Sequence, residues 1–340
     1  MNKDTLFGKT LSELTALAID LGLPKFTGKQ MAEWLYKKDV KSIEEMTNLS
    51  KKARELLSSK YEFGLIDSTK VQESVDGTKK YLFPTVDGKF IETAMIPDED
   101  RKTVCVSSQV GCKMGCLFCM TAKQGFQGQL TAGEIVNQIR NISEWHEVTN
   151  IVYMGMGEPF DNLDEVLKSL EILTSEWGFA MSPRRITVST IGIIPAMLTF
   201  LNKSEAHLAV SLHDPFDVER REFMPVQAAY PLAEVIREIK SWDFGRQRRV
   251  SFEYIVFKDL NDTPKHVAEL VRLLNGIKCR VNLIRFHAIP GTPLQGTDED
   301  TLQKFKDLLN DKGVLTTIRA SRGQDIYAAC GLLSTRELLG

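Results

Sequence analysis

The sequence has no apolar run long enough to cross a membrane, and its first residues lack the apolar stretch of a signal peptide. Cysteine is scarce, with six in 340 residues, which excludes the disulfide framework of small secreted domains. Glycine and proline stay at ordinary levels, which excludes fibrous and disordered classes. We therefore expect a cytoplasmic protein with no membrane association and with reduced thiols.

The sequence also lacks a large excess of charge of either sign, because its formal net charge is only −2. No global field then attracts nucleic acid, and RNA binding would require local basic patches. Each candidate patch can equally be an ordinary solvated surface. The candidates are Lys51-Lys52-Ala-Arg54, Arg184-Arg185, Arg220-Arg221 and Arg246-Gln-Arg248-Arg249.

The chain changes character twice along its length. Residues 1–66 show helical spacing and predict a small accessory domain that could bind RNA. Residues 67–100 hold Asp76-Gly77 and Asp87-Gly88 between β-prone runs, which predicts a β-hairpin extension. From residue 101 to 340, apolar strands alternate with helices, which predicts an α/β fold with a parallel sheet.

Six strand–helix units are too few for a complete eight-fold barrel, so a partial (β/α)6 barrel and an open doubly wound sheet both fit. The predicted strands are 103–107, 150–154, 185–189, 207–212, 250–257 and 280–286, with a further β-prone run at 315–320. The predicted helices are 131–146, 163–177, 194–202, 231–242, 264–275 and 300–311.

Three cysteines form one motif, Cys112-Lys-Met-Gly-Cys116-Leu-Phe-Cys119, directly after the first strand of this region. Cysteine thiolates are the usual ligands of iron–sulfur clusters, and three of them leave one iron of a four-iron cluster open. A zinc site is the alternative, but it would want a fourth Cys or His nearby. Cys105 lies seven residues upstream, and the nearest histidine is His146. We therefore predict a [4Fe–4S] cluster on this motif.

A second motif, Gly155-Met-Gly157-Glu158-Pro159, ends the second strand. Its glycines permit close approach of the backbone, and a carboxylate suits an ammonium group. The carboxyl ends of barrel strands are where such folds place active sites. Taken alone, the motif would be a common turn; behind a cluster motif it indicates a cofactor contact.

The cysteine triplet resembles the signature of the radical S-adenosylmethionine (SAM) superfamily, with the aromatic Phe118 before the last cysteine. That resemblance implies a partial TIM-like barrel with SAM bound to the open iron through its amino and carboxylate groups. It also implies reductive cleavage of SAM to a 5′-deoxyadenosyl radical, with the protein positioning the cofactor.

Three further stretches narrow the resemblance: Cys105-Val-Ser-Ser-Gln-Val-Gly-Cys112, Val210-Ser-Leu-His213 and Arg319-Ala-Ser-Arg-Gly-Gln-Asp-Ile-Tyr-Ala-Ala-Cys330-Gly331. Together they resemble the RlmN/Cfr family of radical SAM RNA methyltransferases over nearly the whole chain. The resemblance implies methylation of adenosine C2 in 23S rRNA and in some tRNAs. Methylation at adenine C8, the activity of the other branch of the family, is the near alternative.

The resemblance also implies roles for residues outside the triplet. Cys330 would take a methyl group from one SAM, and the radical from a second SAM would remove hydrogen from that S-methyl group. Cys105 matches the position that resolves the covalent enzyme–RNA adduct through a transient disulfide, and Glu92 matches the proton acceptor. From the residues alone, Cys105 is equally a core cysteine and Glu92 a solvent-facing carboxylate on a strand. Cys279 is interpreted as structural.

SAM contacts implied by the resemblance fall at strand ends: Gly157, Glu158, Ser189, Ser211, Leu212 and His213. A further contact is His287, which stands where many members carry Asn and which can still donate and accept a hydrogen bond. The implied partners are the RNA substrates and an electron donor such as flavodoxin with its reductase, and a monomer is expected. More distant alternatives are a radical SAM enzyme with a non-RNA substrate and a zinc-stabilised RNA-binding module.

Overall fold

A ten-stranded sheet organises the computed structural model, which describes residues 3–245 and 249–335. The strand order is β14-β13-β12-β11-β10-β9-β6-β5-β4-β3, with parallel pairing from β6 to β14 and antiparallel pairing from β3 to β6. Its strands are β3 (Lys70–Glu73), β4 (Lys79–Pro84), β5 (Phe90–Asp98), β6 (Arg101–Cys105), β9 (Asn150–Tyr153), β10 (Ile186–Thr190), β11 (His207–Ser211), β12 (Val250–Val256), β13 (Cys279–Arg285) and β14 (Thr316–Ile318). Two small pairs lie outside it: β1 (Asp4–Thr5) with β2 (Tyr61–Glu62), and β7 (Gln109–Val110) with β8 (Gly128–Gln129).

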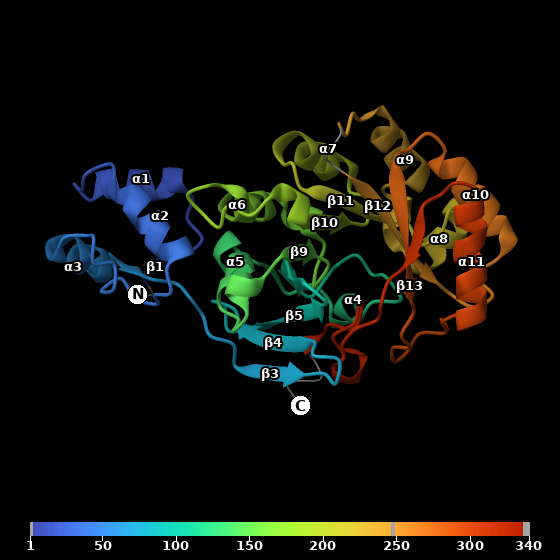
Figure 1. Cartoon of the computed structure of the whole chain (residues 1–340), viewed down its shortest axis with the longest axis horizontal. Helices are drawn as coiled ribbons and strands as arrows, with labels where there is room; N and C mark the ends of the chain where they lie inside the picture. Colours follow the sequence, from blue (N-terminus) through green and yellow to red (C-terminus); the bar gives the residue numbers. More distant parts are fainter. Residues whose placement is uncertain (1–2, 246–248, 336–340) are drawn as a thin grey trace.

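Helices follow the parallel strands as the alternating pattern predicts (Figure 1). They are α5 (Ala132–Arg140), α6 (Leu163–Thr174), α7 (Ile194–Lys203), α9 (Leu232–Ser241), α10 (Pro264–Leu274) and α11 (Glu299–Asp311). Two short helices were not predicted, α4 (Met120–Gln124) and α8 (Asp217–Phe223). Both are shorter than the window of about 11 to 18 residues over which the spacing of apolar residues identifies a helix.

The two faces of the parallel strands have different surroundings, which decides between the two predicted architectures. On β6, Val104 points into the main hydrophobic core, whereas Thr103 and Cys105 line a cavity. On β11, Val210 is in the same core, whereas Ser211 lines a second cavity. A doubly wound sheet would carry helices on both faces. Helices on one face and cavities on the other confirm the partial barrel.

The N-terminal helices α1 (Leu11–Asp20), α2 (Thr27–Lys37) and α3 (Lys51–Lys60) form a core of their own at one end of the molecule (Figure 1). That core also contains Val136 from α5 and Ile172 from α6, so this region packs against the outer helices of the barrel. The boundaries at residues 66 and 100 stay predictions.

Both Asp-Gly pairs form the predicted hairpin turns, between β3 and β4 and between β4 and β5. Gly77 and Gly88 adopt the left-handed φ values of 81° and 73° that such turns require. Since β5 also pairs with β6, these hairpins continue the barrel sheet instead of forming a separate layer.

The interpretation of Arg220-Arg221 as a surface patch is wrong for Arg220, whose side chain is fully buried. Its guanidinium donates to the backbone carbonyls of Leu212, Ile191 and Ser211, and so holds loops together. Most of the candidate patch Arg246-Gln-Arg248-Arg249 lies outside the described residues. Within the described part of the chain, no helix has the length and apolar character needed to span a bilayer.

Candidate active site

The cysteine motif forms a loop whose turns depend on two glycines with left-handed φ, +70° at Gly111 and +72° at Gly115. At Gly111 an added Cβ would lie 1.7 Å from the carbonyl oxygen of Gly125, so only glycine fits there. Cys112 and Cys116 are buried, and Cys119 is half-buried directly before α4. The loop therefore holds three thiols inward at the carboxyl end of the barrel.

The three thiols of the motif lie together. Cys112, Cys116 and Cys119 line one pocket, as the ligands of one metal group must. Burial, followed by the neighbouring Cys119 and Cys112, raises the pKa of the Cys116 thiol well above its usual value. Thiols that face one another in this way fit ligation to separate irons of one cluster.

Glu158 connects the Gly-Glu-Pro loop to the neighbouring strand. Its two carboxylate oxygens accept backbone N–H groups from Phe160 at 3.1 Å and from Ile191 at 3.0 Å. Burial raises the pKa of Glu158 to about 7, against the hydrogen bonds from Thr190, Ile191 and Phe160. Gly157 has φ +96°, and a Cβ there would lie 2.5 Å from the Gln109 side chain.

His213 follows β11 in a left-handed conformation, with φ 57°. Its Nδ1 accepts the backbone N–H of Ile255 at 3.0 Å, which assigns the ring proton to Nε2. Burial, followed by the charge of Arg220, lowers the pKa of His213 to about 3. The ring packs edge-on to Phe118 with centroids 4.8 Å apart. A neutral imidazole with one N–H donor therefore lies beside the cysteine loop.

The predicted cofactor residues do not all face the same way. Ser189, Ser211 and His213 line the pocket of the three cysteines, together with Gly157 and Glu158. The Leu212 side chain points into the main core, so only its backbone could contact a ligand. His287 lines a different pocket, where its Nε2 hydrogen-bonds Ser321 Oγ.

Cys330 lies where two pockets meet, on the loop that follows β14. It lines the pocket of the three cysteines and also a larger pocket of about 510 Å³ on the barrel's inner face. The larger pocket also contains Cys105, at the end of β6. Cys330 is solvent-exposed and Cys105 is buried.

Arg319 lines both pockets and interacts electrostatically with both thiols. Burial, followed by the neighbouring Cys330, raises the pKa of Cys105 to about 12, against the lowering effect of Arg319. Burial alone would lower the pKa of Arg319, but Cys330, Glu253 and Cys105 together raise it above its usual value. The guanidinium is held 3.2 Å from Glu253 Oε2.

Glu92 is fully buried on β5, contrary to a solvent-facing strand carboxylate. Its Oε1 lies 3.2 Å from Lys80 Nζ, and its Oε2 accepts the backbone N–H of Ser334 at 2.8 Å. Two residues further along β5, Ala94 pairs with Cys105 of β6, and the two pack with Ala328 in one small cluster. Glu92 therefore lies on the sheet face that the Cys330 loop covers.

Comparison with known proteins decides the family. Residues 106–274 match the radical SAM superfamily, and residues 5–63 match the ribosomal RNA large subunit methyltransferase N-terminal domain. The chain is 56% identical over 337 residues to a protein of Bacteroides fragilis named probable dual-specificity RNA methyltransferase RlmN, covering 99% of this chain and 98% of that one. A dual-specificity RNA methyltransferase RlmN of Geotalea uraniireducens is 42% identical over 336 residues, again covering 99% and 98%.

The chain belongs to the RlmN family of radical SAM enzymes.

A solved structure supports the same assignment. The crystal structure of a radical SAM methyltransferase from Sphaerobacter thermophilus superposes with a TM-score of 0.91 at 38% identity, covering 97% of this chain and 99% of that one. The likeness to this radical SAM methyltransferase thus extends over nearly the whole chain and is not limited to the barrel.

Residue-level reasoning from the sequence missed two members of this site. Arg319 opens the last RlmN-like stretch, but nothing in its spacing distinguishes it from a surface arginine. Gln109 lies between Cys105 and Cys112 and accepts the Glu158 backbone N–H at 2.8 Å. Its amide also donates to Asp161 at 2.7 Å. Such positioning roles depend on contacts across loops, which a single sequence does not reveal.

Proposed function

We propose that this chain methylates C2 of a specific adenosine in 23S rRNA and of adenosine in some tRNAs, with Cys330 carrying the methyl group. The observation that carries the proposal is the position of Cys330. It lines both the pocket of the cysteine triplet and the larger pocket that contains Cys105. A methyl carrier must meet its methyl donor on one side and its acceptor on the other.

Cys112, Cys116 and Cys119 would hold the [4Fe–4S] cluster, and SAM would bind in the same pocket. When bound, the cluster and SAM supply the methyl group for Cys330 and the hydrogen-abstracting radical that ordinary side chains cannot generate. The C2 carbon of adenine is electron-poor and cannot attack a SAM methyl group directly, so chemistry of this kind is needed.

The chain's own residues orient SAM. We assign hydrogen bonds to the side chains of Ser189, Ser211 and His213, the last through its Nε2–H. Gly157 and Leu212 would contribute backbone contacts, and the Glu158 carboxylate would face the SAM amino group. His287 is assigned to the same set by resemblance, although its position in the larger pocket suits the nucleotide equally.

Release of product needs a base and a second thiol. Glu92 would accept the proton from the adenine ring, and Cys105 would form a disulfide with Cys330 as the carbon–sulfur bond breaks. Arg319 supports this role because its charge interacts with both sulfurs and lowers the pKa of the Cys105 thiol. All six cysteines are free thiols in the structure, which is the reduced state that begins such a cycle.

The larger pocket suits a nucleotide that has been turned out of its RNA stack. Arginines surround it, at positions 101, 280, 285, 319 and 322, with Asp98 as the acidic residue among them. Guanidinium groups bind phosphate oxygens in bidentate fashion. RNA would lie across this opening and reach the N-terminal helices, where Lys51 and Lys52 are exposed.

The remaining assignments follow from the chemistry of the reaction. The cluster needs an external one-electron donor such as flavodoxin with its reductase, and a reducing cytoplasm keeps Cys105 and Cys330 as thiols. We propose that the enzyme acts as a monomer, since both pockets are built within one chain.

The test is methylation of 23S rRNA and tRNA transcripts by the anaerobically reconstituted enzyme, with nucleosides analysed by mass spectrometry. The proposal expects 2-methyladenosine from the wild type and none from Cys330→Ala, whereas Cys279→Ala retains activity. Methylation at C8 would overturn the regiochemistry. Turnover by Cys330→Ala would overturn the methyl carrier, and the absence of cluster and SAM cleavage would overturn the radical SAM assignment.

A further inference from the structure

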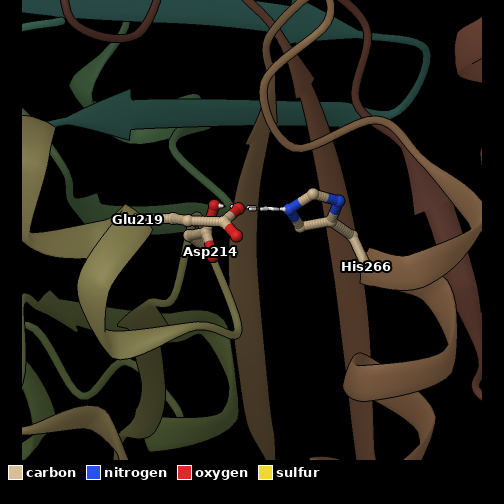
Figure 2. Close-up of side chains that lie close together, drawn as sticks. All are labelled: Asp214, Glu219 and His266. Carbon is tan, nitrogen blue, oxygen red and sulfur yellow. Dashed lines mark hydrogen bonds and ion pairs between the residues drawn. The ribbon is translucent and has the colours of Figure 1, made fainter.

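Three side chains outside the proposed active site converge on one point (Figure 2). Asp214 follows His213, Glu219 is on α8, and His266 is on α10. One ligand atom from each lies within 4.8 Å of the other two. His266 Nε2 is 2.8 Å from Glu219 Oε2 and 3.8 Å from Asp214 Oδ2. The side chains of Asp214 and His266 are 0% and 4% exposed, so this is not a surface coincidence of charges.

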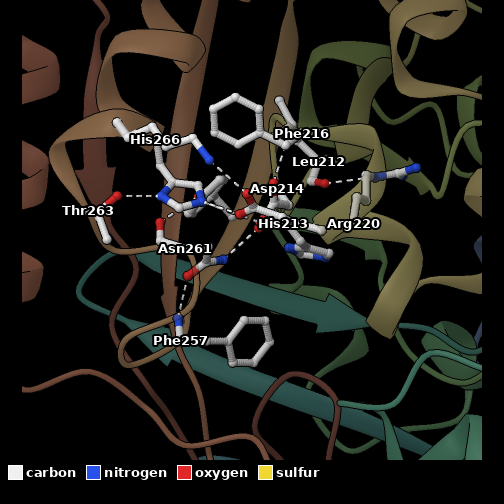
Figure 3. A network of polar contacts seen from close by, with 12 residues as sticks. Leu212, His213, Asp214, Phe216, Arg220, Phe257, Asn261, Thr263 and His266 are labelled. Carbon is white, nitrogen blue, oxygen red and sulfur yellow. Dashed lines mark hydrogen bonds and ion pairs between the residues drawn. The ribbon is translucent and has the colours of Figure 1, made fainter.

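In each of the three side chains, the polar atom that points away from the cluster contacts a neighbouring residue. The Phe216 backbone N–H donates to Asp214 Oδ1 at 2.8 Å, and Lys265 Nζ donates to Glu219 Oε1 at 2.9 Å. Thr263 Oγ1 lies 2.7 Å from His266 Nδ1. These contacts, several of which Figure 3 shows, leave Asp214 Oδ2, Glu219 Oε2 and His266 Nε2 directed at one another. Metal ligands in proteins are oriented by outer partners in this manner.

Asp214 supplies an independent sign that a ligand belongs here. Its Oδ2 is fully buried and has no hydrogen-bond partner among the described residues. An isolated buried carboxylate oxygen is costly, so natural structures place a proton donor or a cation beside it. The nearest positive candidate in the cluster is His266 Nε2, which already engages Glu219.

We propose that Asp214, Glu219 and His266 bind a divalent transition-metal ion, with Zn²⁺ the ion that this donor set suits. Imidazole nitrogen and carboxylate oxygen are both zinc ligands, and three protein ligands leave a fourth position for a water molecule. Ligand atoms around a tetrahedral zinc ion lie about 3.4 Å apart, between the two measured separations. His266 would bind as the neutral ring, with its one proton on Nδ1 toward Thr263 Oγ1; the ion would displace the Nε2 proton that faces Glu219, and the Nε2 lone pair would bind the ion.

The bound ion would brace the turn beside the active site. His213, with its left-handed backbone, accepts Asn261 Nδ2–H at its carbonyl oxygen at 2.6 Å (Figure 3). A non-glycine residue in that conformation depends on its surroundings to hold it. A metal on Asp214 would cross-link this turn to α10 through His266. The ion would therefore support the wall of the pocket from outside, and no step of the reaction is assigned to it.

The test compares the reconstituted holoprotein with Asp214→Asn and His266→Gln, after dialysis against a chelator and addition of ZnCl₂. Asp214→Asn preserves shape and the Phe216 hydrogen bond while removing the ligand charge. Glu222→Gln, at an exposed position on α8, the helix that also carries Glu219, is the matched control. Zinc affinity is measured by competition with a chromophoric chelator, the coordination sphere by zinc X-ray absorption, and stability by thermal melting.

The proposal expects wild type and Glu222→Gln to bind one zinc ion with nitrogen and oxygen neighbours and to melt at a higher temperature with zinc. Both ligand variants should bind it at least tenfold more weakly and lose the thermal shift. A sulfur-containing coordination sphere, or equal zinc affinity and thermal shift in a cooperatively melting Asp214→Asn protein, would overturn the proposal. Neither result depends on RNA methylation, so this test is separate from that of the proposed function.

Discussion

The backbone N–H of Ser334 donates to Glu92 Oε2 at 2.8 Å, joining residues 242 positions apart in the sequence. The contact ties the segment that follows Cys330 to buried strand β5. The other oxygen of Glu92 lies 3.2 Å from the buried Lys80 Nζ. A change in the protonation of Glu92 would therefore alter a hydrogen bond to the loop that carries Cys330, the proposed methyl carrier.

Replacing Glu92 with Gln should stall release without preventing methylation of Cys330. Glutamine still offers an oxygen to the Ser334 N–H, so the loop should stay in place, but an amide cannot take up the adenine proton. We expect the S-methyl group on Cys330 in peptide mass spectra and an enzyme–RNA adduct on denaturing gels. Glu73→Gln, which changes an exposed carboxylate on edge strand β3, should turn over normally. Normal turnover by Glu92→Gln would exclude Glu92 as the proton acceptor.

Cys105→Ala should also accumulate the enzyme–RNA adduct. The Cys105 side chain packs with Ala94 and Ala328, so alanine leaves the fold largely unchanged, and the expected loss is chemical. Cys279→Ala is the control, because Cys279 is half-buried against the main hydrophobic core and does not line either active-site pocket. The measurement is adduct per mole of enzyme in a single turnover. Equal product yield from Cys105→Ala and wild type would contradict a resolving role.

The barrel could be predicted from the sequence because its signal is repeated. Each parallel strand is a short apolar run followed by an amphipathic helix, and the two Asp-Gly turns have a fixed backbone requirement. The cysteine motif could be recognised as easily, since its three cysteines are neighbours in the chain. The rule that barrel sites form at the carboxyl ends of strands predicted a site at Ser211, and Ser211 lines the same pocket as those cysteines.

What could not be predicted depends on contacts between distant segments. Glu92 alternates with apolar residues on β5, and only the C-terminal loop above it turns an outward position into a buried one. Leu212 lies between two pocket residues but faces the core, because successive strand-end side chains alternate. His266 is on α10, far in sequence from Asp214, and the two meet because they follow the adjacent parallel strands β12 and β11.

Arg319→Met should slow both steps that need a sulfur nucleophile. The guanidinium interacts electrostatically with both sulfur atoms, so its loss removes a positive charge from beside them. We therefore expect methylation of Cys330 at pH 7 to be slower by on the order of tenfold, about 1.4 kcal/mol in the barrier, measured as the rate of appearance of the S-methyl peptide. Arg319→Lys should recover most of that rate, because a charge remains even though the planar contact with Glu253 is lost. An unchanged rate in Arg319→Met would show that the arginine acts only on packing.

Glu158→Gln should change how stability depends on pH. Burial raises the pKa of the folded carboxyl to about 7, from 4.5. The folded state therefore binds the proton more tightly than the unfolded chain does. The stability contributed by the protonated group is complete below pH 4.5 and is lost as pH rises to 7, a difference of about 3 kcal/mol. Glutamine does not titrate, so this pH-dependent loss should vanish in the variant.

The measurement is the free energy of unfolding in urea at pH 5 and pH 8, taken as the difference between Glu158→Gln and wild type, so that contributions common to both proteins cancel. That difference should move in favour of the variant by up to about 3 kcal/mol between the two pH values. Glu55→Gln, at an exposed position on α3, should show the same difference from wild type at both. A pH-independent difference for Glu158→Gln would mean that the hydrogen bonds from Phe160 and Ile191 fully offset burial, leaving the carboxylate charged throughout and ready to face a SAM amino group at any pH.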